Sequence, residues 1–184
     1  MSNICSVLNN EHNINFVDIP YPHLIIDNAL PIKYYEKLNQ AFPSYDKIIK
    51  SDIINGGKYK DNFPYRYNAS DSLNDREIPK IWREFVGFHT SFKFVEDFYS
   101  IFNSSINKLY PGSRGKLPNE SNTGIRFTGR HYFNLDCQFV INTPTKEETS
   151  VIDPHLDNPK EFYAALLYMR DPNDDSVGGN LTTY

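Results

Sequence analysis

One stretch decides the fold class, and it reads PHLDNPKEFYAALLYMRDPNDDSVGGNLTTY from Pro154 to Tyr184. It contains two runs of strand-forming residues, EFYAALLYM and NLTTY, with turn-forming residues between them. Three similar runs precede them in the sequence: IRFTGRHYF, LDCQFVINT and TSVIDPHLD. Consecutive short strands of this kind are typical of an antiparallel sandwich or a jelly roll, so we expect the C-terminal part of the chain to form such a structure.

The pattern upstream of these strands is helical. From Ile78 to Leu109, apolar residues recur at steps of three and four, which predicts two amphipathic helices with a break near Thr90. A shorter helix, IKYYEKLNQAF, is predicted to start at Pro31 and to end at Pro43. The run HLIIDNAL before it predicts a short strand and a turn. Helices followed by strands favour an α+β chain.

Two segments of the N-terminal part are predicted to be loops. Residues 44–73 are rich in Asn, Asp, Gly and Tyr without a clear period, and residues 111–124 are rich in Pro, Gly and Ser. The 184 residues contain no repeat and no linker, so we expect one domain over residues 1–184. Residues 1–122 would form a mostly helical and loop support region, and residues 123–184 the first part of the jelly roll.

Composition and charge narrow the classes of partner and the compartment. The net charge is -4 and acidic and basic residues are interspersed, so no basic block attracts nucleic acid or an anionic membrane. The first residues lack the basic and apolar segments of a signal peptide, and no run is long enough to span a bilayer, which predicts a cytoplasmic protein. Cys5 and Cys137 lack the spacing of a zinc site and are expected to be free thiols.

His155 and Asp157 are the candidate metal ligands. Side chains at positions i and i+2 of a strand point to the same face, so these two would project together from the predicted strand. An imidazole and a carboxylate are two of the three ligands in the facial triad of non-haem iron(II) oxygenases, which leaves positions open for a cosubstrate and oxygen. The pair alone is also compatible with a surface histidine beside a turn aspartate, because short motifs occur by chance.

The residues around this pair resemble a known family. The pair is followed by Asn-Pro, by an apolar run that ends in Tyr168, by an acidic loop, and by Gly-Gly-Asn-Leu at the start of the next run. In this order the 31 residues resemble the core of prolyl-hydroxylase-like iron(II)- and 2-oxoglutarate-dependent dioxygenases. The resemblance implies a double-stranded β-helix of the jelly-roll or cupin-like type, with N-terminal helices packed on it.

The same resemblance implies cofactors and site residues. His155 and Asp157 match the proximal histidine and the carboxylate that hold Fe(II). Tyr168 matches the tyrosine that hydrogen-bonds the distal carboxylate of 2-oxoglutarate, although a tyrosine that closes an apolar strand is as often a core residue. Gly178 and Gly179 match turn glycines. The implied reaction uses O2, converts 2-oxoglutarate to succinate and hydroxylates a C–H bond of a small molecule, a sugar or a protein side chain, with ascorbate as an optional further cofactor.

Part of the family pattern is missing. In the family, the distal histidine ligand and the basic residue that pairs with 2-oxoglutarate follow the Gly-Gly turn, whereas here no histidine follows His155. We therefore expect the jelly roll to be incomplete at its C-terminus, and the chain to be a fragment of a longer protein rather than a natural truncation. With two ligands it should show little or no turnover by itself, and its open sheet edge should favour self-association.

Other polar residues receive ordinary structural interpretations. His131, beside aromatic residues, is expected to be a packed residue with one hydrogen bond. Arg126, Arg130 and Arg170 could meet an anionic substrate, but arginines near strand ends are usually solvated. The acidic residues after them are expected to form a solvated turn: Asp171, Asp174 and Asp175.

Alternatives to an active oxygenase stay open. The chain could be a non-catalytic jelly-roll binding module that keeps the fold and has lost the metal, or an inactive truncated oxygenase. The pair of His155 and Asp157 argues against a module without metal, because such a module has no reason to place both groups on one face. A metal-dependent cupin of another reaction type would need a different ligand pattern near His155.

Overall fold

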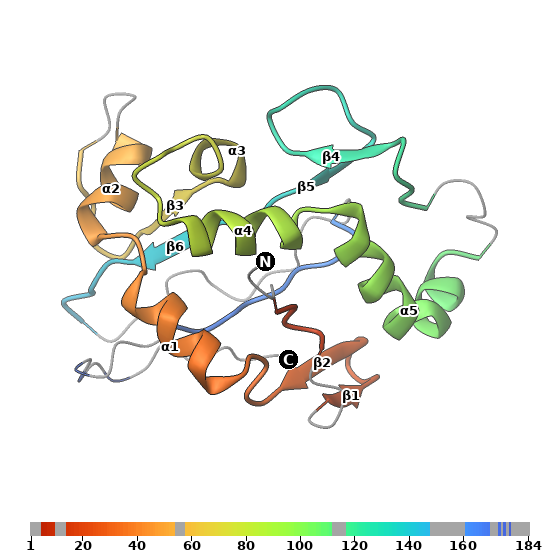
Figure 1. Ribbon diagram of the computed structural model, residues 1–184. Coiled ribbons are helices and arrows are strands. Elements are labelled where there is room, and N and C mark those ends of the chain that lie inside the picture. Colours follow the sequence, from red (N-terminus) through yellow and green to blue (C-terminus); the bar gives the residue numbers. More distant parts are fainter. Residues whose placement is uncertain are drawn as a thin grey trace.

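The structure is a computed structural model that describes residues 5–9, 14–53, 58–111, 117–147 and 161–169, and residues 173, 175 and 177. These residues form short helices and strands (Figure 1). The helices are α1 (Ile32–Gln40), α2 (Tyr45–Ile53), α3 (Ala69–Ser72), α4 (Lys80–His89) and α5 (Phe92–Leu109). The strands are β1 (Ile14–Val17), β2 (His23–Ile26), β3 (Pro64–Tyr67), β4 (Thr123–Ile125), β5 (Phe133–Leu135) and β6 (Phe139–Asn142).

Helices α4 and α5 confirm the prediction of two amphipathic helices with a break between them. Only Thr90 and Ser91 separate the two. The Thr90 hydroxyl donates to the carbonyl of Val86 at 2.8 Å, and Ser91 Oγ accepts from the amide of Phe94 at 3.4 Å. The break falls at this pair because both side chains satisfy backbone groups that a helix end leaves without partners.

Trp82 of α4 lies at the centre of the main hydrophobic core, with 3% of its surface exposed. Its ring meets those of Phe85, Phe42 and Phe139 edge to face, with centroid separations of 5.3, 5.5 and 5.0 Å. The indole N–H donates to the carbonyl of Leu38 at 2.9 Å. Trp82 therefore joins α4 to α1, to the residues after α1 and to β6. Its apolar ring is packed against other rings, and its N–H group has a hydrogen-bond acceptor.

The described strands form three two-stranded sheets, which pair β1 with β2, β3 with β6, and β4 with β5. In the antiparallel pair of β3 and β6, Tyr65 lies opposite Ile141 and Tyr67 lies opposite Phe139. Both tyrosines are buried, whereas Arg66 between them is exposed, as expected for a strand with one face on a core. No barrel is closed within the described residues, so the jelly roll stays a prediction.

The prediction of a loop over residues 44–73 is wrong, because α2, β3 and α3 lie within it. Helix α2 begins after Ser44, whose Oγ accepts a hydrogen bond from the amide of Lys47 at 3.3 Å. The helix buries Ile48 and Ile49. Tyr45, Ile48 and Ile49 have helical spacing, but the many polar residues around them obscured this pattern in the sequence.

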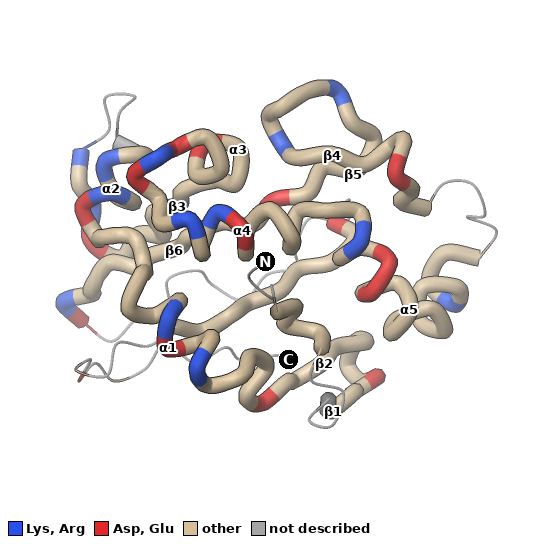
Figure 2. The backbone as a smooth tube through the Cα atoms, viewed as in Figure 1, with Lys and Arg blue, Asp and Glu red and all other residues tan. Residues whose placement is uncertain are grey.

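A seven-residue loop, residues 126–132, joins β4 and β5 and projects from the body of the molecule (Figures 1 and 2). The two strands run parallel, although parallel strands usually need a crossover of about a dozen residues or more. Each strand is only 3 residues long, so a short loop is enough to bring the chain back. The His131 ring lies so close to Gly124 that a Cβ there would come within 2.3 Å of it.

Candidate functional site

The predicted metal ligands His155 and Asp157 lie outside the described residues, as do Gly178 and Gly179. Tyr168 is described: it belongs to no helix or strand, and 62% of its surface is exposed. Within the described part of the chain, no three His, Cys, Asp or Glu side chains gather into a group that could hold a metal ion.

Two aromatic residues anchor the segment that follows the predicted ligands. The Tyr163 ring stacks on Phe98 of α5 at a centroid separation of 4.3 Å. The Phe162 ring lies 6.1 Å from Phe133 of β5. Burial raises the pKa of Tyr163 to about 12, so the phenol stays neutral over the physiological range. Residues 161–169 are thus held against both the helical part and the β4–β5 unit.

The middle of this segment is exposed. Residues 164–168 face solvent, with 65% of Leu166 exposed, before Met169 packs against the main core. No strand forms over EFYAALLYM, and no backbone hydrogen bond joins residues 161–169 to another described residue. The strand predicted there is therefore not formed, because a strand requires backbone partners and the contacts that hold this segment come from side chains.

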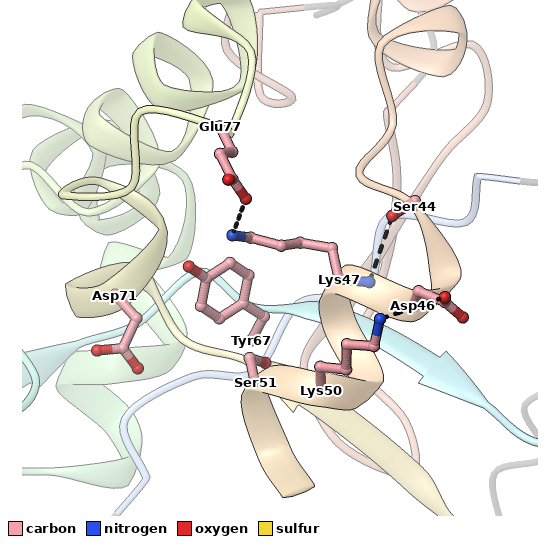
Figure 3. A pocket seen from close by; sticks show the side chains of 8 residues that line it. All are labelled: Ser44, Asp46, Lys47, Lys50, Ser51, Tyr67, Asp71 and Glu77. Carbon is pink, nitrogen blue, oxygen red and sulfur yellow. Dashed lines mark hydrogen bonds and ion pairs between the residues drawn. The ribbon is translucent and has the colours of Figure 1, made fainter. Parts of the chain in front are cut away.

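Polar side chains of the described residues line an open cavity of about 600 Å³ (Figure 3). The sequence analysis did not predict this cavity. Residues of α2 line one side, and Tyr67 of β3 and Glu77 line another. The signal that could have found it is the alternation of acidic and basic residues in YDKIIKSDI, which places Lys47 and Lys50 on the polar side of a helix whose isoleucines are buried.

Lys47 is the centre of an ion-pair network beside this cavity. Its ammonium group pairs with Asp75 and, at 2.6 Å, with Glu77. The Tyr67 hydroxyl donates to Asp75 at 2.7 Å. The hydrogen bonds from Lys47 and then Tyr67 lower the pKa of Asp75 to about 2, and the two carboxylates raise the pKa of Lys47. The network therefore holds α2 to the residues before α4, and Asp75 stays ionised and hydrogen-bonded at neutral pH.

His89 is a second buried polar group. Its Nδ1 donates to the carbonyl of Phe85 at 2.8 Å, and its Nε2 accepts from the amide of Val7 at 3.2 Å. The rings of Phe85, Phe88 and Phe94 surround it. Burial lowers the pKa of His89 to about 4, so the ring is neutral at pH 7. With both nitrogens occupied, this histidine is structural.

Cys5 and Cys137 are free thiols, as predicted. Cys137 packs against the main core, and burial raises the pKa of its thiol to about 12. A thiol that stays protonated is a poor nucleophile and a poor metal ligand, so this cysteine serves packing.

His131 is also placed as predicted, as a packed residue with one hydrogen bond. Its Nε2 lies 3.3 Å from Thr128 Oγ1, and its ring covers Gly124.

Among the helices the structure describes, none combines the length and apolar character needed to cross a bilayer. No protein-family model matches the sequence, and no curated protein or solved structure is significantly similar to it.

Proposed function

We propose that this protein is an iron(II)- and 2-oxoglutarate-dependent oxygenase that hydroxylates a C–H bond. The observation that carries the proposal is the pair of His155 and Asp157, followed by an apolar run that ends in Tyr168 and by a Gly-Gly turn. This order resembles the core of prolyl-hydroxylase-like members of that class. The proposal includes a cytoplasmic location and a small-molecule, sugar or protein side-chain substrate.

The chemistry of the donor set fits Fe(II). A neutral imidazole nitrogen and a carboxylate oxygen are preferred ligands of this ion, and they leave positions for a chelating keto acid and for O2. When bound, iron and 2-oxoglutarate supply the oxidising chemistry, and 2-oxoglutarate is converted to succinate. The role of His155 and Asp157 is to hold the ion, and the charge of Asp157 offsets part of the charge of the cation.

The anchoring of residues 161–169 supports the proposal. Phe162 follows Asp157 by five residues in the sequence, and the rings of Phe162 and Tyr163 meet β5 and α5. The segment that follows the proposed ligands is therefore fixed on the described fold by side-chain contacts.

The exposure of Tyr168 is compatible with a role in cosubstrate binding. Its phenol is not buried in the core, so its hydroxyl is free to donate a hydrogen bond to a carboxylate.

Metal binding by the chain tests the proposal. Titration with Fe(II) under anaerobic conditions, followed by calorimetry, should show one bound ion per chain. His155→Ala and Asp157→Ala should each weaken binding by at least about tenfold, since each removes a ligand. His131→Ala is the matched control, because this histidine is partly exposed and packs on the β4–β5 unit.

Three results are informative about the alternatives. Binding that the two ligand variants leave unchanged would overturn the proposal. Absence of Fe(II) binding would favour a non-catalytic jelly-roll module or an inactive truncated oxygenase. Fe(II) binding that 2-oxoglutarate does not strengthen would favour a metal-dependent cupin of another reaction type.

A further inference from the structure

The loop of residues 126–132 presents an unusual set of side chains to solvent. Phe127 is 66% exposed and Tyr132 is 72% exposed, and Arg126 and Arg130 in the same loop are exposed as well. The loop contains no acidic residue, and its cationic positions stand out in Figure 2. The exposed rings of Phe127 and Tyr132 and the two arginines therefore form a surface that is both apolar and positively charged.

Both guanidinium groups lack a carboxylate partner among the described residues. The guanidinium carbon of Arg126 lies 4.7 Å from the centroid of the Phe127 ring, which holds the two side chains together. By contrast, three exposed lysines pair with an acidic residue of their own helix, and Lys146 pairs with Asp61. The loop therefore carries positive charge that the described fold does not neutralise.

The loop is fixed in shape by contacts at its base. The amide of Arg126 donates to Leu135 at 2.8 Å, the hydroxyl of Thr128 donates to Ile125 at 2.7 Å, and the amide of Tyr132 donates to Asn122 at 3.0 Å; each acceptor is a backbone carbonyl. A loop held in this way presents its side chains without a large ordering cost when a partner binds.

Phe127 is held in a strained conformation. Its φ is 69°, in the left-handed region that bulky residues avoid. Burial of the ring does not offset this strain, because most of the ring is exposed to solvent. Strained backbone that the core does not use is concentrated at binding and active sites.

We propose that residues 126–132 bind an acidic segment of a partner protein, with Arg126 and Arg130 pairing with carboxylates and Phe127 and Tyr132 contacting apolar side chains between them. Guanidinium forks match carboxylates in a bidentate geometry. Tyrosine and arginine are also enriched among the residues that dominate binding energy at protein interfaces. This binding needs no metal, so its test is independent of the test of the proposed oxygenase activity.

The overall charge decides between an acidic protein segment and the other anionic surfaces. Nucleic acid and anionic membranes are extended polyanions that many cations must neutralise, whereas this chain carries a net charge of -4 and the loop offers two arginines. Two guanidinium groups suit a few carboxylates on a short segment.

Fluorescence polarisation with a labelled peptide of repeated Glu-Phe-Asp-Leu tests the proposal. The peptide should bind, added salt should weaken it, and the amide peptide of repeated Gln-Phe-Asn-Leu should bind at least about tenfold less tightly. The double variant Arg126→Gln with Arg130→Gln should weaken binding of the acidic peptide by at least about tenfold. The matched control is Lys33→Gln with Lys37→Gln, which removes two exposed charges from α1 and should leave the affinity unchanged.

Phe127→Gly separates binding from folding. Glycine adopts a positive φ without strain, so this variant should melt no lower than the wild-type protein and yet bind the peptide several-fold less tightly. Lack of binding by the wild-type chain, or binding that the arginine variant retains, would overturn the proposal. So would a preference of the loop for oligothymidylate or phosphatidylserine vesicles over the acidic peptide.

Discussion

The amide of Val7 donates a hydrogen bond to Nε2 of His89 over 3.2 Å, across 82 positions of sequence. The opposite nitrogen of the ring donates to the carbonyl of Phe85. A neutral imidazole can make both hydrogen bonds. A protonated imidazole cannot accept from the amide of Val7, because its Nε2 then carries a hydrogen that faces the amide hydrogen. The N-terminal segment is therefore joined to α4 by a contact that requires the neutral ring.

This contact predicts a dependence of stability on pH. The pKa of His89 is lowered by burial from the ordinary 6.5 to about 4, so the unfolded chain takes up the proton first as the pH falls. The free energy of unfolding should be at its full value above about pH 6.5 and decrease toward pH 4, by about 3 kcal/mol from this group. Urea unfolding at several pH values, followed by the fluorescence of the single tryptophan, measures it.

Two variants isolate the contribution of His89. His89→Gln does not titrate and should lose the part of the acid-induced decrease that lies between about pH 6.5 and pH 4. His23→Gln replaces a histidine whose Nδ1 bonds only a nearby carbonyl at an exposed site, and should retain the decrease. An unchanged decrease in His89→Gln would contradict the assignment.

The network of Lys47 and Asp75 predicts a second, more acidic window. Asp75 has its pKa lowered to about 2, so the stability it contributes is present above the ordinary 3.8 and is lost as the pH falls from there toward 2. Asp75→Asn should lower the free energy of unfolding by about 1–2 kcal/mol, because Lys47 loses one of its two charged partners and Tyr67 keeps only a neutral acceptor.

The same cavity offers the control for this prediction. Asp46 and Lys50 pair at 3.5 Å with about three quarters of each side chain exposed, 75% and 76%. Asp46→Asn should therefore change the free energy of unfolding by less than about 0.5 kcal/mol. Chemical denaturation at low and high salt measures both variants, and equal effects would show that the Lys47 network contributes no more than a surface ion pair.

The helical framework could be predicted from sequence because its signals are local. The spacing of apolar residues predicted the break between α4 and α5, and the structure confirms it at Thr90 and Ser91. Helix α1 after Pro31 and strand β2 followed the same local rules. Helix α2 was missed because its apolar face is only a few residues wide and sits in a polar stretch.

Contacts between distant parts of the chain could not be predicted in this way. The pairing of β3 with β6 joins residues more than 70 positions apart, and nothing in either short strand specifies its partner. The parallel pairing of β4 and β5 runs against the expected connection length. At the candidate site, sequence could name His155, Asp157 and Tyr168 by residue type and spacing, while the anchoring of the next segment on α5 depends on tertiary contacts of Phe162 and Tyr163.

The environment of Trp82 predicts a large effect of a small change. Trp82→Phe removes the indole N–H that bonds the Leu38 carbonyl and leaves part of the ring volume empty between Phe42 and Phe139. We expect the free energy of unfolding to fall by about 2–4 kcal/mol. Circular dichroism during urea unfolding measures this loss. Tyr132→Phe, at an exposed ring, should change stability by less than about 0.5 kcal/mol.

Tyr163 and Tyr168 lie five positions apart on one segment, and they should respond to substitution in opposite ways. The Tyr163 ring stacks on Phe98 at 4.3 Å, whereas 62% of Tyr168 is exposed. Tyr163→Ala should lower the free energy of unfolding by about 2–3 kcal/mol, because the segment loses its main anchor on α5. Tyr168→Phe should leave stability unchanged, since it removes only a hydroxyl at an exposed site.

The same two residues separate structure from the proposed chemistry. If Tyr168 donates to the distal carboxylate of 2-oxoglutarate, Tyr168→Phe should weaken binding of this acid to the Mn(II)-loaded chain by about fivefold, the equivalent of one hydrogen bond of about 1 kcal/mol. Tyr163→Phe keeps the ring stacked on Phe98 and is the matched control, with unchanged affinity expected in calorimetry. An affinity that falls in Tyr163→Phe but not in Tyr168→Phe would remove Tyr168 from the proposed site. The pair of His155 and Asp157 would then be tested by its metal binding alone.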